Sequence, residues 1–294
     1  MNTNEKVQEI LVAHNLDFRI EKEQLVSQSG LETPYYGLFN DKTGECINTV
    51  KEGYTVSQND EIVELVLRGI EGFGELSVSK AGSLHGGRKV FIQLAIDGYS
   101  LVGSENIKRY VTVIDSNDGS SGLSVGVGEL VMSCQNQFFK FYKKGQSKFK
   151  HTASLIERIK EIPRLIELSL SESMKLTETY KAFQSTPITK QLANDMVKHL
   201  LGFDKTMSIK KEGEISTRSL NKMEALYNHI EKETNQKGQN LFGLFSGVTS
   251  WTTHETSAPR RENGREESLM LGTNYRTNQE AFKFTMDKLD LVMA

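Results

Sequence analysis

Hydrophobic and polar residues alternate in short runs along the first quarter of the chain. After a helical run at residues 5–14, strand-like runs occupy residues 17–26, 35–40 and 46–56. Turn-forming residues separate these runs, so antiparallel hairpins are the natural connection. Behind a cap at Ser57–Asp60, apolar residues recur every three to four positions as far as Ile70. This spacing predicts a helix that packs across the meander.

The strand pattern returns in the next sixty residues and divides into two hairpins. Two runs flank His85-Gly-Gly87, and two others flank Asn117-Asp-Gly119. The second pair is the stronger signal, because Asp-Gly supports the primed turns that match the twist of paired strands. Alternating valines such as Val111 and Val113 place one face of each strand in a core.

From Ala153 onward the apolar spacing is helical. Helices are expected at residues 153–184, 188–202, 217–234 and 278–293, with a loop at 253–265. Pro163 should kink the first helix or begin a new one. The predicted fold class is α+β: an antiparallel β-meander and hairpins packed with helices in the N-terminal half, and a mainly α-helical C-terminal half. We divide the chain into an α+β domain at 1–152 and a helical region at 153–294, and leave open whether they pack as one unit.

The composition is that of an ordinary globular protein. Apolar residues make up 37% and charged residues 25% of the 294 residues, with 4 prolines, which excludes disordered, fibrous and membrane chains. The N-terminus lacks a signal-peptide pattern, and no apolar stretch is long enough to span a bilayer. We expect a cytoplasmic protein with no membrane partner.

Candidate metal and nucleotide motifs are incomplete. Cys46 and Cys134 have no cysteine or histidine at metal-ligand spacing. The Gly82–Lys89 segment lacks the spacing of a Walker loop. A calcium loop beginning at Asp115 fails, because Gly126 stands where a bidentate glutamate is required. We therefore expect no metal and no cofactor.

Two short stretches resemble catalytic pairs without completing them. His254 with Glu255 could act as acid and base, and Ser133 with Cys134 as nucleophiles, but neither pair has a further partner at motif spacing. A reactive thiol also needs an exposed, electropositive setting that a strand position does not promise. We expect no enzymatic activity.

The charges of the chain are segregated. Residues 1–75 hold six basic and fourteen acidic residues, which gives −8, whereas residues 76–164 hold thirteen basic and seven acidic residues, which gives +6. Such a distribution favours an anionic partner for the middle of the chain. Chance segregation on a solvated surface is the alternative.

The basic segment QNQFFKFYKKGQSKFK at 135–150 interleaves lysines with aromatic residues. Single-strand binders combine a cationic track for phosphates with aromatic faces for bases. Alternatively, Phe138, Phe139 and Tyr142 bury themselves at helical spacing and leave the lysines solvated. The predicted nucleic-acid-binding residues are Lys80, Arg88, Lys89, Lys108, Arg109, Lys140, Phe141, Lys143, Lys144, Lys148, Phe149 and Lys150.

A series of landmarks runs in order through almost the whole chain. They are Val50 with Tyr54 and Val56, Gly82–Arg88, Asp115–Ser121, Cys134–Asn136, Lys150–Thr152 and Trp251–His254. This series resembles the phage/plasmid-like protein family, a domain of unknown function. The family usually has an Arg-Val-Val-Cys-x-Asn-Thr-Leu string, and this chain lacks its arginine and its Thr-Leu pair. The resemblance implies a gene of a mobile element in a bacterial host cell, and at the level of fold it extends to single-strand annealing proteins of the RecT and Erf type.

These observations favour a non-enzymatic protein of a phage or mobile element that binds a single-stranded nucleic acid; DNA is the expected ligand, and RNA is left open. It would act as a homo-oligomer that could promote annealing and recombination. The first alternative is a protein-interaction factor, anti-defence or regulatory, that contacts a host protein through its acidic N-terminal part. The second is a hydrolase acting on a phosphate-containing substrate.

Overall fold

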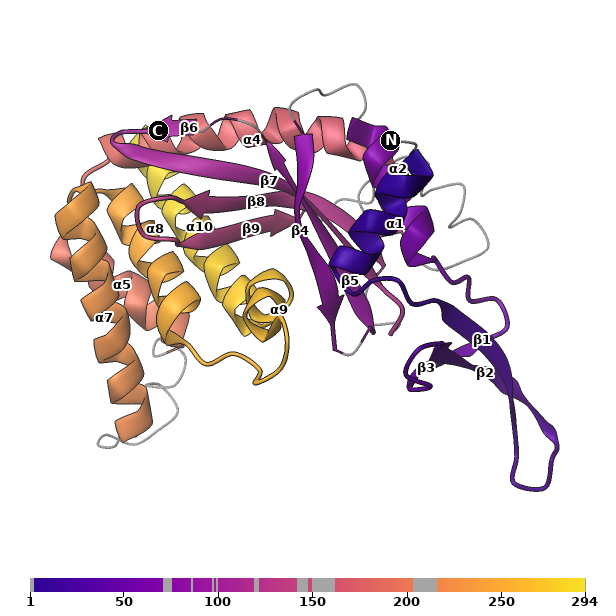
Figure 1. The fold of residues 1–294 in the computed structure, drawn as a ribbon. Coiled ribbons are helices and arrows are strands. Elements are labelled where there is room, and N and C mark those ends of the chain that lie inside the picture. The colour runs from indigo at the N-terminus through magenta and orange to yellow at the C-terminus, as the bar shows by residue number, and fades with distance from the viewer. Residues whose placement is uncertain are drawn as a thin grey trace.

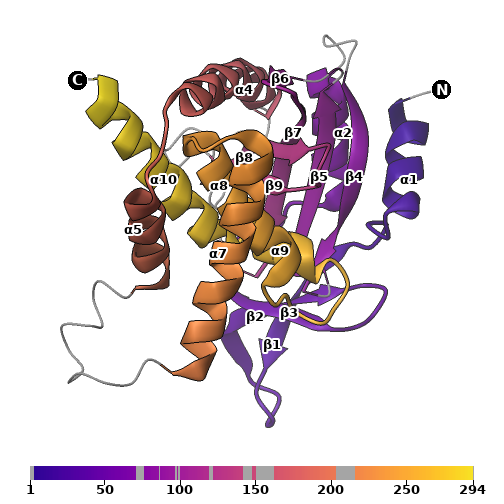
Figure 2. The same ribbon diagram turned by 90° about the vertical axis from the view of Figure 1, so that its left-hand side faces the viewer.

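The computed structural model describes residues 3–70, 76–85, 87–96, 98, 100–118, 122–141, 148–149, 162–202 and 216–293. Within these residues, two antiparallel sheets and two sets of helices pack together (Figure 1). Figure 2 shows the large sheet between α1 (Thr3–Ala13) on one side and the helices of the second half on the other. The predicted α+β class is confirmed.

The small sheet consists of β1 (Ile20–Val26), β2 (Glu32–Asn40) and β3 (Cys46–Lys51). Ile20 pairs with Asn40 and Tyr36 pairs with Val50, both antiparallel, so the predicted meander is confirmed. Figure 1 shows this sheet projecting from the body of the molecule. We call residues 20–51 the arm.

The helix that follows the arm is α2 (Asn59–Ile70). It contacts α1 and α4 (Ile162–Ser185), and its apolar face enters a core shared with strands of both sheets, whereas the prediction placed it across the small sheet alone. The sequence pattern identified its apolar face, with Ile62 and Val66, but not the surface that covers that face. Ser57, expected in the cap, donates instead to the carboxylate of Asp115.

The large sheet has seven antiparallel strands in the order β10-β8-β7-β5-β4, with β6 beside β7 and β9 beside β8. The strands are β4 (Leu76–Leu84), β5 (Lys89–Ile96), β6 (Ser100–Val102), β7 (Glu105–Ser116), β8 (Leu123–Val131), β9 (Gln137–Phe141) and β10 (Lys148–Phe149). Both predicted hairpins, β4 with β5 and β7 with β8, are confirmed. Alternate side chains enter different cores: Val90 and Ile92 pack with α1 and α2, whereas Phe91 packs with Leu269 and Met270.

The second half is helical within the described residues. Besides α4, its elements are α5 (Lys190–Leu201), α7 (Thr217–Lys237), α8 (Leu241–Ser250), the π-helix η1 (Trp251–Glu255), α9 (Gly264–Met270) and α10 (Thr273–Met293). Pro163 lies in the first turn of α4, where its missing N–H leaves no helical bond unmade. The part of the predicted first helix at 153–161 lies outside the described residues. No helix among the described residues combines the length and hydrophobicity needed to cross a membrane.

The predictions missed α8, η1 and α9. All ten residues of α8 are buried, so the segment has no polar face, and its sequence carries no amphipathic period to reveal a helix. The loop predicted at 253–265 is wrong at both ends, because η1 extends to Glu255 and α9 begins at Gly264.

An aromatic cluster joins the two halves. Phe138 of β9 lies 5.2 Å from the ring of Phe245 on α8 and 5.3 Å from that of Phe282 on α10. Tyr180 and Phe183 of α4 extend the cluster. The sheet and the helical half therefore share one hydrophobic core.

Close packing of α8 on α7 depends on a glycine. A Cβ at Gly247 would lie 2.5 Å from Cα of Ile230, which is backbone and cannot move aside as a side chain would. Gly247→Ala should therefore lower the free energy of unfolding by about 1–3 kcal/mol, the cost typical of overpacking. This exceeds the gain of about 1 kcal/mol from helix propensity. Urea unfolding measures the change.

Gly53→Ala is the matched control, because no heavy atom lies within 4 Å of a Cβ at Gly53. Its free energy of unfolding should stay within about 0.5 kcal/mol of wild type. Equal stability of the Gly247 and Gly53 variants would contradict the close packing of α7 and α8.

Candidate functional site

Arg109, predicted to contact phosphate, lies in a buried ion pair. It stands directly opposite Glu129 on β8, and its Nε donates to Glu129 Oε1 at 2.8 Å. Its Nη1 donates to Ser100 Oγ and Thr177 Oγ1, each at 2.7 Å. Tyr180 donates to the second carboxylate oxygen of Glu129, and burial, followed by the charge of Glu129, raises the pKa of Tyr180. The prediction for Arg109 is wrong, because a phosphate could reach it only by breaking this network.

Three other predicted residues are also engaged within the protein. Lys89 is 8% exposed, and its Nζ lies 3.1 Å from Asp118 Oδ2. Phe141 is buried in the core beneath α9. Lys80 is partly exposed but forms an ion pair with Glu266 of α9. Lys89 and Phe141 are therefore not available to a ligand, and Glu266 neutralises the charge of Lys80.

The side chains of the remaining predicted residues are bound less tightly within the protein. Lys108 and Lys140 place their Nζ atoms 5.8 and 4.8 Å from the ring centres of Tyr110 and Phe282, and burial lowers the pKa of Lys140. Arg88 is exposed in the turn between β4 and β5. Lys143, Lys144 and Lys150 lie outside the described residues, and of Lys148 and Phe149 only the backbone is described, as strand β10.

These residues do not form one basic track within the described part of the chain. Lys89, next to Arg88, pairs with Ser116 at the end of β7, whereas Lys108 lies near the beginning of that strand. Eight residues of strand separate the two positions, which is roughly 26 Å. The predicted site therefore needs correction: its described members are dispersed over the large sheet, and several are paired with acids.

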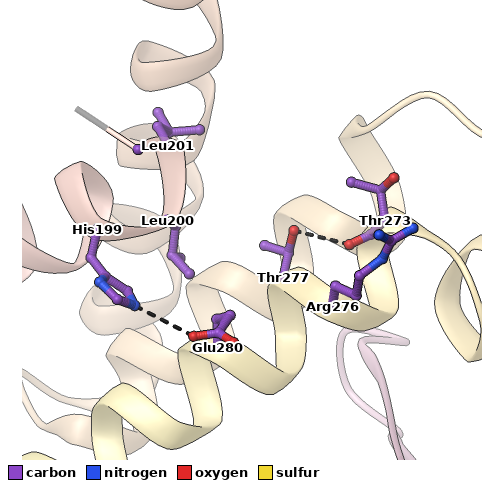
Figure 3. Close-up of a pocket in the computed structure, with 8 residues that line it drawn as sticks. His199, Leu200, Leu201, Thr273, Arg276, Thr277 and Glu280 are labelled. Atoms are coloured by element: carbon purple, nitrogen blue, oxygen red, sulfur yellow. Dashed lines mark hydrogen bonds and ion pairs between the residues drawn. The ribbon is translucent and has the colours of Figure 1, made fainter. Parts of the chain in front are cut away.

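A groove in the helical half brings together residues that the sequence analysis did not select. Two adjoining cavities, of about 430 and 600 Å³, are both lined by Thr273, Arg276 and Thr277 at the beginning of α10. Figure 3 shows the first cavity between these residues and the end of α5, with His199 and Leu201 on its far side. We call the two cavities together the α10 groove.

The α10 groove carries unneutralised positive charge. Arg276 is exposed, and among the described residues its guanidinium forms no hydrogen bond or ion pair. Lys222 of α7, which lines the second cavity, is also unpaired within that part of the chain. Glu280 lines the first cavity, 3.7 Å from His199, and its carboxylate opposes the charge of Arg276 there, so the excess of positive charge lies in the second cavity. The first turn of the 21-residue α10 adds the positive end of a helix dipole, so the groove suits an anion.

Arg276 is not among the predicted site residues, because the sequence pattern predicts a last helix that begins at residue 278 and leaves Arg276 in a loop. The helix begins five residues earlier, at Thr273. A signal was present: Gly272-Thr273-Asn274 is a turn residue followed by residues favoured at helix starts.

The edge of the groove reaches the large sheet through Glu267. Arg261 binds both carboxylate oxygens of Glu267, at 2.8 and 3.0 Å, and His85 Nε2 lies 2.6 Å from Oε1. Burial lowers the pKa of His85; Glu267 opposes this shift, but Arg261 already neutralises its charge. A neutral His85 with its proton on Nε2 donates to Glu267 and connects the β4–β5 turn to α9; Arg261 Nη2, 3.3 Å from the same nitrogen, then donates to Glu267 alone.

Landmarks far apart in the sequence meet in the structure. Tyr54 donates from its hydroxyl to the carbonyl oxygen of Ser116 at 3.3 Å. His254 Nε2 lies 3.0 Å from the carbonyl oxygen of Cys134 and 3.1 Å from Asn136 Oδ1. These contacts stabilise the turns after β7 and β8, and they give the landmarks a structural role.

Replacing His85 with glutamine should reduce the loss of stability in acid. Because the pKa of His85 lies below its ordinary value, the unfolded chain takes up the proton first, and the folded state loses stability as pH falls below about 6.5. Glutamine can still donate to Glu267 but does not titrate. Urea unfolding at about pH 7.5 and 5.5 measures the effect: the two proteins should be similar at the higher pH, and the variant should lose less at the lower one. Equal losses would contradict the assignment.

Comparison with known proteins identifies the family. Residues 46–281, from the beginning of β3 into α10, match the model of one family, described as a domain of unknown function (DUF932). No curated protein and no solved structure is significantly similar to the chain. The family match does not bear on a phage origin or on a likeness to the RecT and Erf proteins. The chain belongs to the DUF932 family.

Proposed function

We propose that the protein binds single-stranded DNA and that the α10 groove holds part of the phosphate backbone. Arg276 carries this proposal, because it lines both cavities and has no acidic partner among the described residues. A guanidinium is suited to bidentate contact with a phosphate. The proposed ligand is thus still a polyanion, but the proposed site lies in the helical half and not on the large sheet.

The geometry of the groove supports a chain-like ligand. Thr273, Arg276 and Thr277 line both cavities, so neighbouring phosphates could be held on either side of the guanidinium. Leu200 and Leu201 line the first cavity and offer apolar surface to a sugar or base. Phosphate contacts of this kind fix the position of the strand without reading its sequence.

The proposed role extends to annealing by a homo-oligomer encoded on a phage or other mobile element, without catalysis of bond cleavage. The annealing role and the mobile-element origin are supported by a resemblance to the phage/plasmid-like protein family. The landmarks that carry this resemblance include Asp115–Ser121 and Cys134–Asn136.

Arg276→Gln should weaken binding of a labelled single-stranded oligonucleotide about tenfold, the effect of losing a charged hydrogen bond. The slope of log affinity against log salt should also fall by about one, because one fewer counterion is released. Fluorescence anisotropy over a salt series measures both the affinity and the slope, and matched DNA and RNA oligonucleotides show which nucleic acid is the ligand.

Arg68→Gln is the matched control. Arg68 is an exposed arginine on α2 that pairs with Glu64 within its own helix, and its loss should leave binding unchanged. If the Arg276 and Arg68 variants bind alike, the α10 groove is not the site; if the wild type binds no oligonucleotide at low salt, the function itself is wrong.

A second candidate function, contact with a host protein, is favoured by the arm. Three apolar side chains are exposed at its tip: Val26 at 59%, Leu31 at 70% and Tyr35 at 45%. Exposed acids, Glu21 and Glu23, lie beside them on β1. Capture of a host protein that survives nuclease treatment and is lost in Leu31→Asp, but not in Arg276→Gln, would favour this function.

A further inference from the structure

Cys134 lies in a different setting from the one that the sequence suggested. It belongs to the turn between β8 and β9, not to a strand, and its side chain is partly exposed. Its carbonyl oxygen is held by His254 at 3.0 Å, which fixes the position of the residue. The turn therefore presents the thiol at the surface in a defined orientation.

A buried lysine supplies the electropositive partner. Lys237, in the last turn of α7, donates from Nζ to Cys134 Sγ at 3.2 Å. Its side chain is 1% exposed and is paired with Glu233, whose side chain is 0% exposed. Although burial alone would lower the pKa of Lys237, the hydrogen bond and charge of Glu233 and the proximity of Cys134 raise it overall. Lys237 is therefore charged near neutral pH, and besides its ion pair with Glu233 its ammonium reaches the sulfur of Cys134. Reactive cysteines are typically found beside a cation.

A second observation concerns Glu233. One of its carboxylate oxygens binds Lys237, but Oε1 is buried and has no hydrogen-bond partner among the described residues. A buried carboxylate oxygen without a donor is costly. This oxygen belongs to the carboxylate that binds the lysine beside Cys134.

We propose that Cys134 is a site of modification by peroxide, and that Lys237 and Glu233 favour its conversion to a sulfenic acid. The thiolate sulfur attacks one oxygen of hydrogen peroxide, the S–O bond forms and the O–O bond breaks. The departing hydroxide takes up a proton and leaves as water. The sulfur loses two electrons, the peroxide gains them, and thiol plus hydrogen peroxide gives sulfenic acid plus water. The inference is independent of the α10 groove.

The chain contains its own reference thiol in Cys46. Cys46 is exposed, and its Sγ donates a hydrogen bond to the carbonyl oxygen of Asn48, at 3.5 Å, with no cation bonded to it among the described residues. If access alone governed reactivity, Cys46 would react faster than Cys134. If the ammonium governs it, the order is reversed.

The test treats the full-length protein with limiting hydrogen peroxide, traps sulfenic acid with a 1,3-dione, and quantifies both cysteines by peptide mass spectrometry. Cys134 should be labelled at least about tenfold faster than Cys46, in keeping with the selectivity of thiols beside a cation. Labelling of Cys46 at an equal or higher rate would overturn the proposal, and this comparison needs no substitution in the core.

Variants then test the role of the lysine. Lys237→Met should reduce labelling of Cys134 to the level of Cys46, whereas Lys237→Arg, which keeps a cation, should retain most of the difference. Lys232→Met, at an exposed position of the same helix, is the control and should label as wild type. Thermal unfolding identifies variants that are not folded. Fast labelling of Cys134 in folded Lys237→Met would show that the ammonium is not responsible.

Discussion

The ion pair between Arg109 and Glu129 constrains how the two halves of the molecule fit together. Both charges are buried, and a buried charge that loses its partner destabilises a protein by about 3–5 kcal/mol. Thr177 and Tyr180 of α4 supply further hydrogen bonds to the pair, while Arg109 Nη2 is buried without a partner among the described residues. The buried charges of the sheet therefore gain these hydrogen bonds only when α4 is docked on it. Tyr180 and Phe183 in turn contact Phe282, so the position of α10, and of the groove at its beginning, follows from the same constraint.

Much of the β structure could be predicted because apolar and polar residues alternate along a strand that buries one face. The same alternation contained the correct position of Arg109, which is in phase with the buried Val111 and Val113 of β7. Lys108 and Arg109 carry the same charge, but neighbours on a strand point to opposite faces, so charge type alone does not show which of the two is accessible.

The helical half was less predictable for a physical reason. An amphipathic helix such as α5 or α7 can be predicted because its apolar residues recur with the helical period. All residues of α8 are buried, so its sequence has no polar stripe that would reveal the helix. The groove could not be inferred either, since it depends on how the end of α5 lies against the beginning of α10. Such a contact joins segments some seventy residues apart and leaves no local pattern.

The outer strand of the arm limits how copies of the chain can associate. An uncovered β-edge offers free backbone groups to any other strand, and proteins commonly guard such edges with charge. In β1 the exposed Glu21 and Glu23 would set carboxylate against carboxylate if two arms aligned edge to edge. The arm can thus stand clear of the body in a crowded solution without growing into a continuous intermolecular sheet.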